Sequence, residues 1–396
     1  MKRRNFLKNT ALASTAAMVP SFLQAYSPKR IFRSRSEKIL VVVQLSGGND
    51  GLNTIVPYRN DLYYQQRPTL AIPEAEVIKV SDELGFHPAM AGLRAIYEKG
   101  LLSVVNSVGY PNPDRSHFRS MDIWHTASAS DTYLSTGWLG RYLDHQCTGC
   151  DRPYTALELD DTLSLALKGA ETNGFAMSSP EQLKKMTSNR YFKVLAQHAH
   201  DDEENVAYLY KTLIDTQASA DYLATQARIY TSRVTYPATD FGRDLKQIAE
   251  LITADTDTHI YYVSLTGFDT HAGQQNTQQR LLEQYSAGMQ AFVEDLSQNK
   301  LLDDTLIMTF SEFGRRVQQN ASGGTDHGTA NNLFLIGGQL SHPGFFNAAP
   351  DLSDLDEGDL RYQIDFREVY ATVLGKWLNA DVRQIMERNF TGLPLL

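Results

Sequence analysis

The segment "KILVVVQLSGGNDGLN", residues 38–53, decides the fold class. Its first half is an aliphatic run without polar alternation, which is typical of a strand buried on both faces of a parallel sheet. Its second half is a turn rich in glycine and asparagine, where such a strand ends. Four further segments repeat this plan: "LLSVVNSVG" at 101–109, "HIYYVSLTG" at 259–267, "TLIMTFSEFG" at 305–314 and "NLFLIGG" at 332–338.

Helical patterns separate these runs. "HPAMAGLRAIYEKG" at 87–100 has apolar residues at helical spacing and stops at a glycine. "QQRLLEQYSAGMQAFVEDLSQNK" at 278–300 carries an amphipathic stripe. Residues from about 180 to 235 are helix-prone throughout, which predicts a helical insertion. Because strands alternate with helices elsewhere, we expect an α/β fold with a mostly parallel central sheet flanked by helices.

The composition indicates the class of protein and the kind of partner that its surface charge allows. The chain has 396 residues, of which 42% are hydrophobic, as in a globular protein with a sizeable core. The formal net charge is -9, and lysine and arginine cluster only at the start. A broad basic surface is therefore absent from the sequence, which excludes nucleic acid as a partner.

The basic N-terminus has the form of a twin-arginine export signal. "MKRRNFLKNTALASTAAMVPSFLQA" places Arg3 and Arg4 before Phe-Leu, a lysine and a weakly apolar stretch. We assign residues 1–30 to the signal and linker, and residues 37–396 to one folded domain that is periplasmic or otherwise exported by this route. Leu23 is a poor fit to cleavage near Ala25, so the signal is either cut elsewhere or kept as an anchor.

This signal implies a partner during export, the twin-arginine translocase, which carries folded proteins. Its apolar stretch is too short and too polar for a stable membrane span, so no transmembrane domain is expected after signal removal. Cys147 and Cys150 form a lone "CTGC" without a second pair to complete a zinc site. In an oxidising compartment we expect a local disulfide or two free thiols there, with no catalytic role.

Acidic, histidine and hydroxyl side chains follow the ends of the predicted strands. Ligands of open α/β sheets collect beyond the carboxyl ends of the strands. The groups found there are Ser46, Asn49 and Asp50; Asp114, Ser116 and His117; Asp269 and His271; Glu312 with Arg315 and Arg316; and Asp326 and His327. A single Asp or His at such a place is usually a cap or a turn residue. Their convergence from separate strands instead predicts a site for a divalent metal, with Asp269 and His271 as two ligands from one turn.

Several motifs resemble those of a known family. "VVVQLSGGNDGLNTIVP", "RSHFRSMDIW", "GFDTHAGQ", "TFSEFGRR" and "GTDHGTANNLFLIGG" are similar to segments of the bacterial DUF1501 proteins, and "IDFREVYATVLGKWLNAD" resembles their C-terminal helix. That family is related to the sulfatases and the alkaline phosphatase superfamily. The resemblance therefore implies an alkaline phosphatase-like fold, two divalent ions, a Ser, Thr or modified Cys nucleophile at a helix start, and ester hydrolysis.

The resemblance also implies roles for individual residues. Asp50 matches an aspartate that bridges metals, Asp269 and His271 match an Asp/His pair, and His327 matches a late histidine ligand. Glu312 stands where an Asp-His pair normally follows the strand.

Two departures from the superfamily pattern bear on the metal. Asp269 and His271 are two residues apart instead of four, and Phe313 replaces a nitrogen ligand. Asp326 is expected to orient the ring of His327. The residues therefore fit two ions, one ion, or a metal that prefers oxygen, and we expect zinc, manganese or calcium.

The segment before the "HFRSMDIW" helix supplies the catalytic candidates. Ser116 opens this helix and is either a nucleophile or an ordinary N-cap. His117 is either a general acid or a metal ligand. Arg115 and Arg315 are candidate anion-binding residues because guanidinium groups bind phosphate and sulfate in bidentate fashion.

Two functions follow from these features. The first is an exported metal-dependent hydrolase of phosphate or sulfate esters, with a small anionic ester as its substrate. The second is a degenerate relative that binds a ligand or partner protein in the periplasm without turnover. A dinucleotide-binding oxidoreductase is disfavoured because "SGGNDG" lacks the G-x-G-x-x-G spacing.

Overall fold

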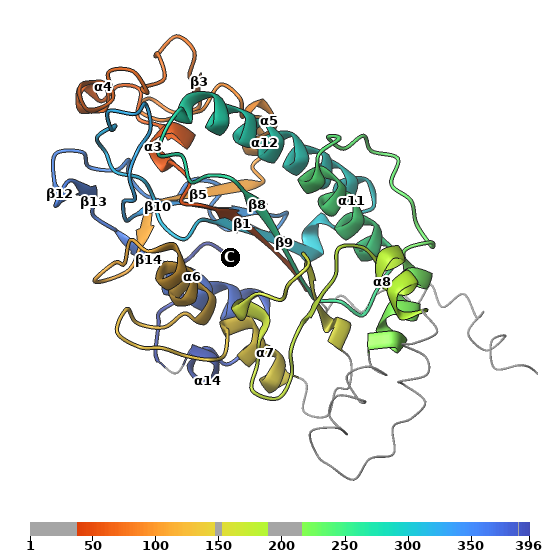
Figure 1. The fold of residues 1–396 in the computed structure, drawn as a ribbon. Coiled ribbons are helices and arrows are strands. Elements are labelled where there is room, and N and C mark those ends of the chain that lie inside the picture. Colours follow the sequence, from red (N-terminus) through yellow and green to blue (C-terminus); the bar gives the residue numbers. More distant parts are fainter. Residues whose placement is uncertain (1–37, 147–152, 189–215, 387) are drawn as a thin grey trace, which may run out of the picture. The chain divides into compact units, whose positions relative to one another are not determined.

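The structure, a computed structural model, describes residues 38–146, 153–188, 216–386 and 388–396. Its centre is a nine-stranded sheet with the order β11-β5-β10-β9-β1-β8-β6-β7, in which β14 also pairs with β5 (Figure 1). The strands are β1 (Ile39–Ser46), β5 (Leu102–Gly109), β6 (Ala156–Leu159), β7 (Phe175–Ala176), β8 (Ile260–Thr266), β9 (Thr305–Phe310), β10 (Asn331–Ile336), β11 (Gly344–Phe345) and β14 (Ile364–Asp365). All five predicted strands are present, and the α/β class with a mostly parallel sheet is confirmed.

One strand of the sheet runs in the opposite direction. β10 pairs antiparallel with both β5 and β9, whereas the other pairings in the sheet are parallel. The beginning of β10 therefore lies at the edge where the parallel strands end. This direction is essential for the site described below, because the loop before β10 carries Asp326 and His327.

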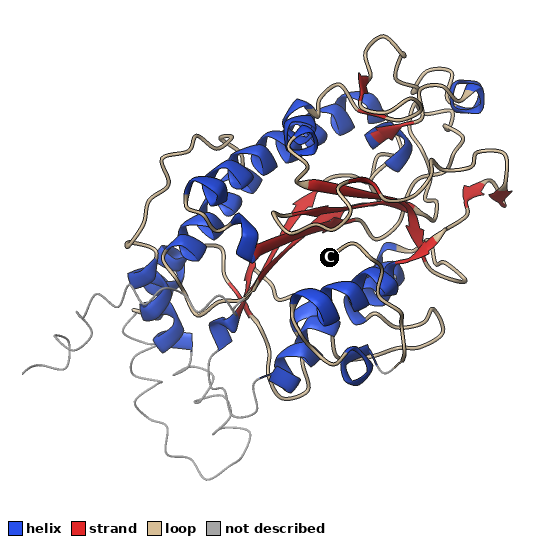
Figure 2. Cartoon of the chain, turned by 180° about the vertical axis from the view of Figure 1, so that it is seen from behind, coloured by secondary structure: helices blue, strands red, loops and turns tan. Residues whose placement is uncertain are grey.

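Helices cover both faces of the sheet, as Figure 2 shows. The side chains of β1 alternate between two apolar clusters, as the pleat requires. Ile39 and Val41 belong to the cluster that includes α5 (Ala91–Glu98), α11 (Asp240–Thr253) and α12 (Gln274–Gln298). Leu40 and Val42 belong to the cluster that includes α6 (His117–Thr126), α7 (Trp138–Gln146) and α13 (Phe366–Thr372). Burial on both faces explains the unbroken aliphatic run in the sequence.

Smaller elements surround this core. They are α3 (Gly51–Thr54), α4 (Asp61–Gln66), α8 (Pro180–Thr187), α14 (Val382–Met386), the 3-10 turns η1 (Pro153–Thr155), η2 (Leu165–Leu167) and η3 (Leu302–Asp304), the π-helical turn η4 (Val373–Trp377), the sheet of β2 (Ile55–Val56), β3 (Ile78–Lys79) and β4 (Gly85–Phe86), and the hairpin of β12 (Leu355–Asp356) and β13 (Asp359–Leu360). The predicted C-terminal helix corresponds to α13 and η4. It begins at a capping box in which Asp365 and Glu368 satisfy each other's backbone N–H groups.

Three predictions fall partly or wholly outside the described residues: the export signal, the pair Cys147 and Cys150, and the middle of the helical insertion. At the ends of that insertion the structure shows α8 and a helical stretch at 216–226. Within the described ranges, no helix is both long enough and apolar enough to cross a membrane.

Candidate metal centre

Chain segments that leave neighbouring strands meet at one edge of the sheet. β9, β1 and β8 lie side by side and parallel, so the turns after them reach the same edge. Asp269 follows β8, Glu312 follows β9, and His327 lies in the loop that enters antiparallel β10. The turn after β1 must pass close to these segments. Gly48 has a φ of 73°, and a Cβ there would lie 2.2 Å from the ring of Phe313, so glycine is required.

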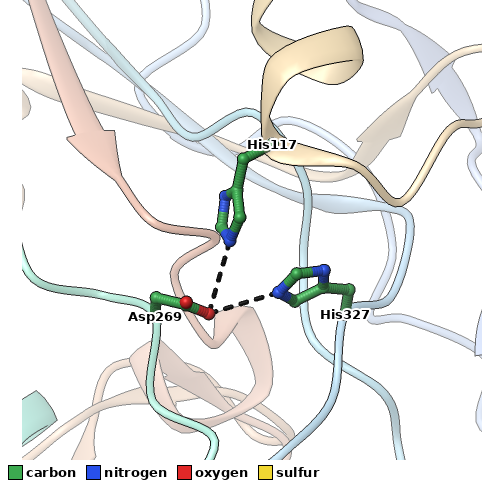
Figure 3. Close-up of side chains that lie close together, drawn as sticks. All are labelled: His117, Asp269 and His327. Carbon is green, nitrogen blue, oxygen red and sulfur yellow. Dashed lines mark hydrogen bonds and ion pairs between the residues drawn. The ribbon is translucent and has the colours of Figure 1, made fainter.

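Ring nitrogens of several histidines converge on one carboxylate oxygen, Oδ1 of Asp269. His117, the first residue of α6, and His327 point their rings at this atom (Figure 3), and their Nε2 atoms lie 3.4 and 3.2 Å from it. The ligand atoms of these three residues lie within 4.8 Å of one another. His271 adjoins the group, because its Nε2 is 3.1 Å from the same oxygen and 2.9 Å from Nε2 of His327. We call these four residues the metal centre.

The second ring nitrogen of each histidine faces an oxygen atom. The three pairs are His117 Nδ1 with Glu312 Oε1 at 3.0 Å, His271 Nδ1 with Asp326 Oδ1 at 3.2 Å, and His327 Nδ1 with the carbonyl oxygen of Arg115 at 2.7 Å. Because these oxygens only accept hydrogen bonds, each Nδ1 carries the proton and donates. The neutral form of each ring would therefore present a lone pair on Nε2 to the common point, and its protonated form would present an N–H group there.

This arrangement of ring nitrogens and a carboxylate oxygen can hold a cation. Nε2 of His117 is buried and makes no hydrogen bond, although it lies near Asp269. A proton bridges a single pair of atoms, whereas a metal ion satisfies all of them. Zinc binds imidazole nitrogen at about 2.0–2.1 Å, so neighbouring ligands of a tetrahedral ion lie about 3.3 Å apart. The distances around Asp269 Oδ1 match this spacing, and three imidazoles with one carboxylate favour zinc over calcium.

The charges around the centre keep Asp269 ionised. Burial would raise the pKa of Asp269, but hydrogen bonds from Arg315 and His327 and the charges of Arg315 and His117 outweigh it and hold the pKa below its usual value. The hydrogen bond to Glu312 raises the pKa of His117. Burial lowers the pKa of His327 and favours the neutral ring that a metal needs.

Arg315 links the turns around the metal centre through hydrogen bonds to their backbone and to Asp269. Its side chain is 2% exposed, and it donates to the carbonyl oxygens of Gly47, Gly48, Phe268 and Thr325. It also contacts Oδ1 of Asp269 at 2.8 Å. All of its donors face protein groups, so the structure does not place Arg315 as the anion-binding residue that the sequence predicts.

Asp50 lies outside the metal centre. Its Oδ2 pairs with Nη1 of Arg67 at 2.6 Å and accepts from Gln274 at 2.5 Å, and both charged side chains are fully buried. The predicted role of Asp50 as a ligand therefore needs correction, because a buried guanidinium neutralises the carboxylate. No sequence pattern links Asp50 to Arg67. The arginine directly follows α4, and no predicted strand end lies there.

Glu312 is close to the centre, but it has a different place from the predicted one. Its Oε1 accepts from the backbone N–H of Gly47 at 2.7 Å as well as from His117, and its Oε2 accepts from Ser311 at 3.2 Å. It therefore holds the ring of His117 instead of approaching an ion directly. Asp326 holds the ring of His271, whereas the sequence pairs it with His327.

The catalytic candidates border the centre. Ser116 is exposed at the N-cap of α6, and its side chain makes no capping hydrogen bond, so its hydroxyl is free of the usual helix contact. Next to it, His117 joins the metal centre, which favours the ligand role over the general acid. Nη2 of Arg115 lies 2.5 Å from Oδ2 of buried Asp359, so this guanidinium is also paired within the protein.

The sequence analysis did not identify Phe313 as a residue that packs against the metal centre. Its ring packs against the rings of His117 and His327, with centroids 4.8 and 4.7 Å apart. The sequence shows Phe313 only as a missing nitrogen ligand. The structure shows that His117, from a different strand end, brings a ring nitrogen to this region.

Solved structures align with most of this chain at low identity. An alkaline phosphatase superfamily protein from Vibrio parahaemolyticus is 10% identical with a TM-score of 0.37, and the match covers 80% of this chain and 63% of that chain. Murine ectonucleotide pyrophosphatase/phosphodiesterase 5 is 10% identical with a TM-score of 0.42, covering 90% and 97%. The PsFucS1 sulfatase from Pseudoalteromonas sp. is 11% identical with a TM-score of 0.40, covering 90% and 70%. TM-scores this low carry no inference about activity.

Sequence comparison gives a firmer result for the family. None of the curated proteins matches this chain. The sequence pattern of the family described as "Protein of unknown function (DUF1501)" matches residues 37–389. This match spans both the motifs at the strand ends and the C-terminal helix, and it confirms the resemblance seen in the sequence. The chain therefore belongs to the DUF1501 family.

Proposed function

We propose that this protein is a metal-dependent hydrolase of phosphate or sulfate esters, exported by the twin-arginine route. The observation that carries the proposal is the convergence of histidine Nε2 atoms on Oδ1 of Asp269, with each Nδ1 fixed by an oxygen acceptor. A histidine that binds metal almost always donates its other N–H in this way.

His117, Asp269 and His327 hold the ion in this proposal, and His271 is the adjoining fourth group. Glu312 and Asp326 keep two of the rings in the required tautomer. When bound, a divalent ion polarises the ester and stabilises the negative charge that develops on its oxygens. Arg315 fixes the carboxylate of Asp269 and the turn after β1, so the centre does not have to reorganise.

Ser116 is the proposed nucleophile. Its hydroxyl is exposed, lies one residue from His117 and stands at the start of α6, whose first N–H groups have no helical acceptor and favour an anion. The Ser116 Oγ bond to phosphorus or sulfur forms as the ester bond breaks. The serine proton leaves to water, and the departing alkoxide takes a proton from water. A water molecule then hydrolyses the seryl ester, releases the inorganic anion and restores the hydroxyl.

A second candidate function is ligand binding without turnover. It is favoured by the pairing of both predicted anion-binding residues with protein groups: Arg115 with Asp359, and Arg315 with Asp269 and backbone carbonyls. A substrate anion would then depend on the ion and the α6 N-terminus alone. Turnover distinguishes the two functions.

The test combines metal analysis with an activity screen. Purified protein is expected to contain about one equivalent of metal, and a chelator should lower its thermal midpoint. Zinc-, manganese- and calcium-loaded samples are then assayed with p-nitrophenyl phosphate, bis-p-nitrophenyl phosphate and p-nitrophenyl sulfate. Turnover should be lost in His327→Ala.

His342→Ala is the matched control, because His342 is exposed and follows β10, at the other edge of the sheet. It should keep both metal and turnover. Protein that binds none of the three metals would overturn the proposal. Metal binding without turnover of any ester would favour the second function.

A further inference from the structure

A cavity of about 500 Å³ adjoins the metal centre. Two of its lining residues also touch the centre. Phe313 packs against the rings of His117 and His327, and the carbonyl oxygen of Arg115 holds His327. A substrate whose ester lies at the metal centre would therefore extend into this cavity, which must suit the rest of the molecule.

The cavity offers hydrogen-bond acceptors, and each of the two arginines among its described lining residues pairs with a carboxylate. Arg115 pairs with Asp359 at 2.5 Å, and Arg361 pairs with Asp354 at 2.9 Å. Three carboxylates belong to the lining itself: Asp114, Asp356 and Glu357. Hydroxyl groups can donate to these carboxylates. The cavity thus suits a polyhydroxyl group.

Exposed aromatic rings lie on segments next to the metal centre and the cavity. Phe118, directly after His117, is 87% exposed, and Tyr362, which lines the cavity, is 39% exposed. Tyr133 is 76% exposed, on the loop after α6. The guanidinium carbon of Arg119 lies 3.8 Å from the centre of the Tyr133 ring, so this ring is held beside the helix that carries Phe118.

The loop that carries Tyr133 is also tied to the cavity side of α6. The side chain of Arg119 donates to the carbonyl oxygens of Ala129, Ser130 and Thr132. The hydroxyl of Ser130 donates to the carbonyl oxygen of Pro111, next to the cavity-lining residue Asn112. The loop that carries Tyr133 is therefore tied both to α6, which carries Phe118, and to the segment that lines the cavity.

The other exposed large hydrophobic side chains of the described chain are aliphatic, and they lie elsewhere. Met186 is in α8, which Figure 1 places far from β12 and β13. Ile229 precedes Tyr230, whose hydroxyl bonds Asp295 near the C-terminal end of α12. Among the described residues, the large exposed aromatic side chains thus lie on segments next to the metal centre or the cavity, where an apolar side chain in water costs free energy without aiding the core.

We propose that the substrate is a polysaccharide bearing phosphate or sulfate esters, whose sugar rings stack on Phe118, Tyr133 and Tyr362. This inference rests on the proposed function, because it places the ester at the metal centre. A sugar ring has an apolar face of C–H groups and a rim of hydroxyls. Flat aromatic rings match the face, and the carboxylates of the cavity match the rim.

Two other kinds of partner fit the surface less well. A docked protein would need a continuous apolar patch, whereas these rings are separated by polar groups. An anionic membrane would be repelled by the cavity carboxylates and by the net charge of -9. The membrane is retained as an outcome of the test.

The test is affinity electrophoresis in native gels that contain laminarin, chondroitin sulfate or dextran sulfate. It compares the wild-type protein with a triple variant, Phe118→Ala, Tyr133→Ala and Tyr362→Ala. The matched control is the double variant Met186→Ala and Ile229→Ala. All five side chains are exposed, so these changes spare the core, and equal thermal midpoints would verify it.

At least one polysaccharide should retard the wild type and the control. In the triple variant, the apparent dissociation constant should rise about tenfold or more. Absence of retardation in all three gels, or equal retardation of the triple variant, would overturn the inference. So would binding to phosphatidylglycerol vesicles that the triple variant alone loses, in a protein that no polysaccharide retards.

The two proposals fail in different ways. Retardation needs no turnover, so retardation of a protein that cleaves no aryl ester supports this inference and contradicts the hydrolase. Turnover of aryl esters by a protein that no polysaccharide retards supports the hydrolase and contradicts this inference.

Discussion

Glu312 Oε1 lies 3.0 Å from Nδ1 of His117, and this contact decides which nitrogen of the ring faces Asp269. Glu312→Gln keeps an acceptor for Gly47 but removes the negative charge that fixes the ring. We expect zinc affinity to fall about 10- to 100-fold, as for other residues that orient metal ligands. Competition with a chromophoric chelator measures the change.

The control for Glu312→Gln is Glu357→Gln, whose side chain is 78% exposed. It removes the same charge from the cavity wall and should leave zinc affinity unchanged. Equal affinity of the Glu312 variant and the wild type would contradict the role given to this carboxylate.

Ser116→Ala separates chemistry from metal binding. The side chain of Ser116 makes no capping bond, so its loss should affect neither the helix nor the ion. We expect turnover to fall about 100-fold or more while the metal content stays the same. The matched variant Ser341→Ala, exposed beyond the end of β10, should retain full activity. A Ser116→Ala protein with wild-type turnover would assign the attack to water.

Arg315→Met should destabilise the fold itself. It leaves several buried carbonyl oxygens without their donor, and each buried group left unsatisfied costs about 1–3 kcal/mol. Urea unfolding measures the loss. Arg316→Met is the neighbouring control, since that side chain is 38% exposed, and it should cost less than about 1 kcal/mol. Equal losses in the two variants would remove Arg315 from its bracing role.

Glu158 makes stability depend on pH. Burial raises the pKa of this carboxyl to about 7, against its usual 4.5. The unfolded chain therefore releases the proton at lower pH than the native protein does, and native stability falls as pH rises from 4.5 to 7. Glu158→Gln should be more stable than the wild type at pH 8, by on the order of 2 kcal/mol, and gain nothing at pH 4.

Urea unfolding at the two pH values checks this prediction. Gln keeps an acceptor for the N–H of Ser164, which lies 2.6 Å from Oε2 of Glu158. Exposed Glu171→Gln should show no such dependence on pH. A constant difference between Glu158→Gln and the wild type at both values would mean that this carboxyl stays ionised.

Export is tested in the N-terminal segment. Replacing Arg3 and Arg4 together by lysine keeps the charge but removes the twin-arginine pattern. We expect the double variant to remain in the cytoplasm at its full length, as seen by cell fractionation. The change Lys29→Arg in the linker is the charge-preserving control. Normal periplasmic recovery of the double variant would exclude this route.

The sequence was sufficient for most of the sheet, because aliphatic runs such as that of β1 report burial on both faces. It could not give the direction of β10, since a buried strand has the same pattern whichever way it runs. The direction is set by pairing with β5 and β9, which lie about 200 and 20 residues away along the chain.

The candidate site was predictable only in part. Asp269, His271 and His327 stand out because they follow or precede strands. The role of Glu312 depends on which groups its carboxylate contacts. In the structure these are the backbone N–H of Gly47 and the ring of His117. The pairing of Asp50 with Arg67 has no periodic signal at all, since it depends on how a loop crosses the sheet edge.

The metal centre draws its ligands from residues as far apart as 117 and 327. An N-terminal fragment of the chain cannot assemble it, so binding of an ion would require β5, β8 and β10 to be in place. If the chain is exported in the folded state, as proposed, the ion would be bound in the cytoplasm, before export.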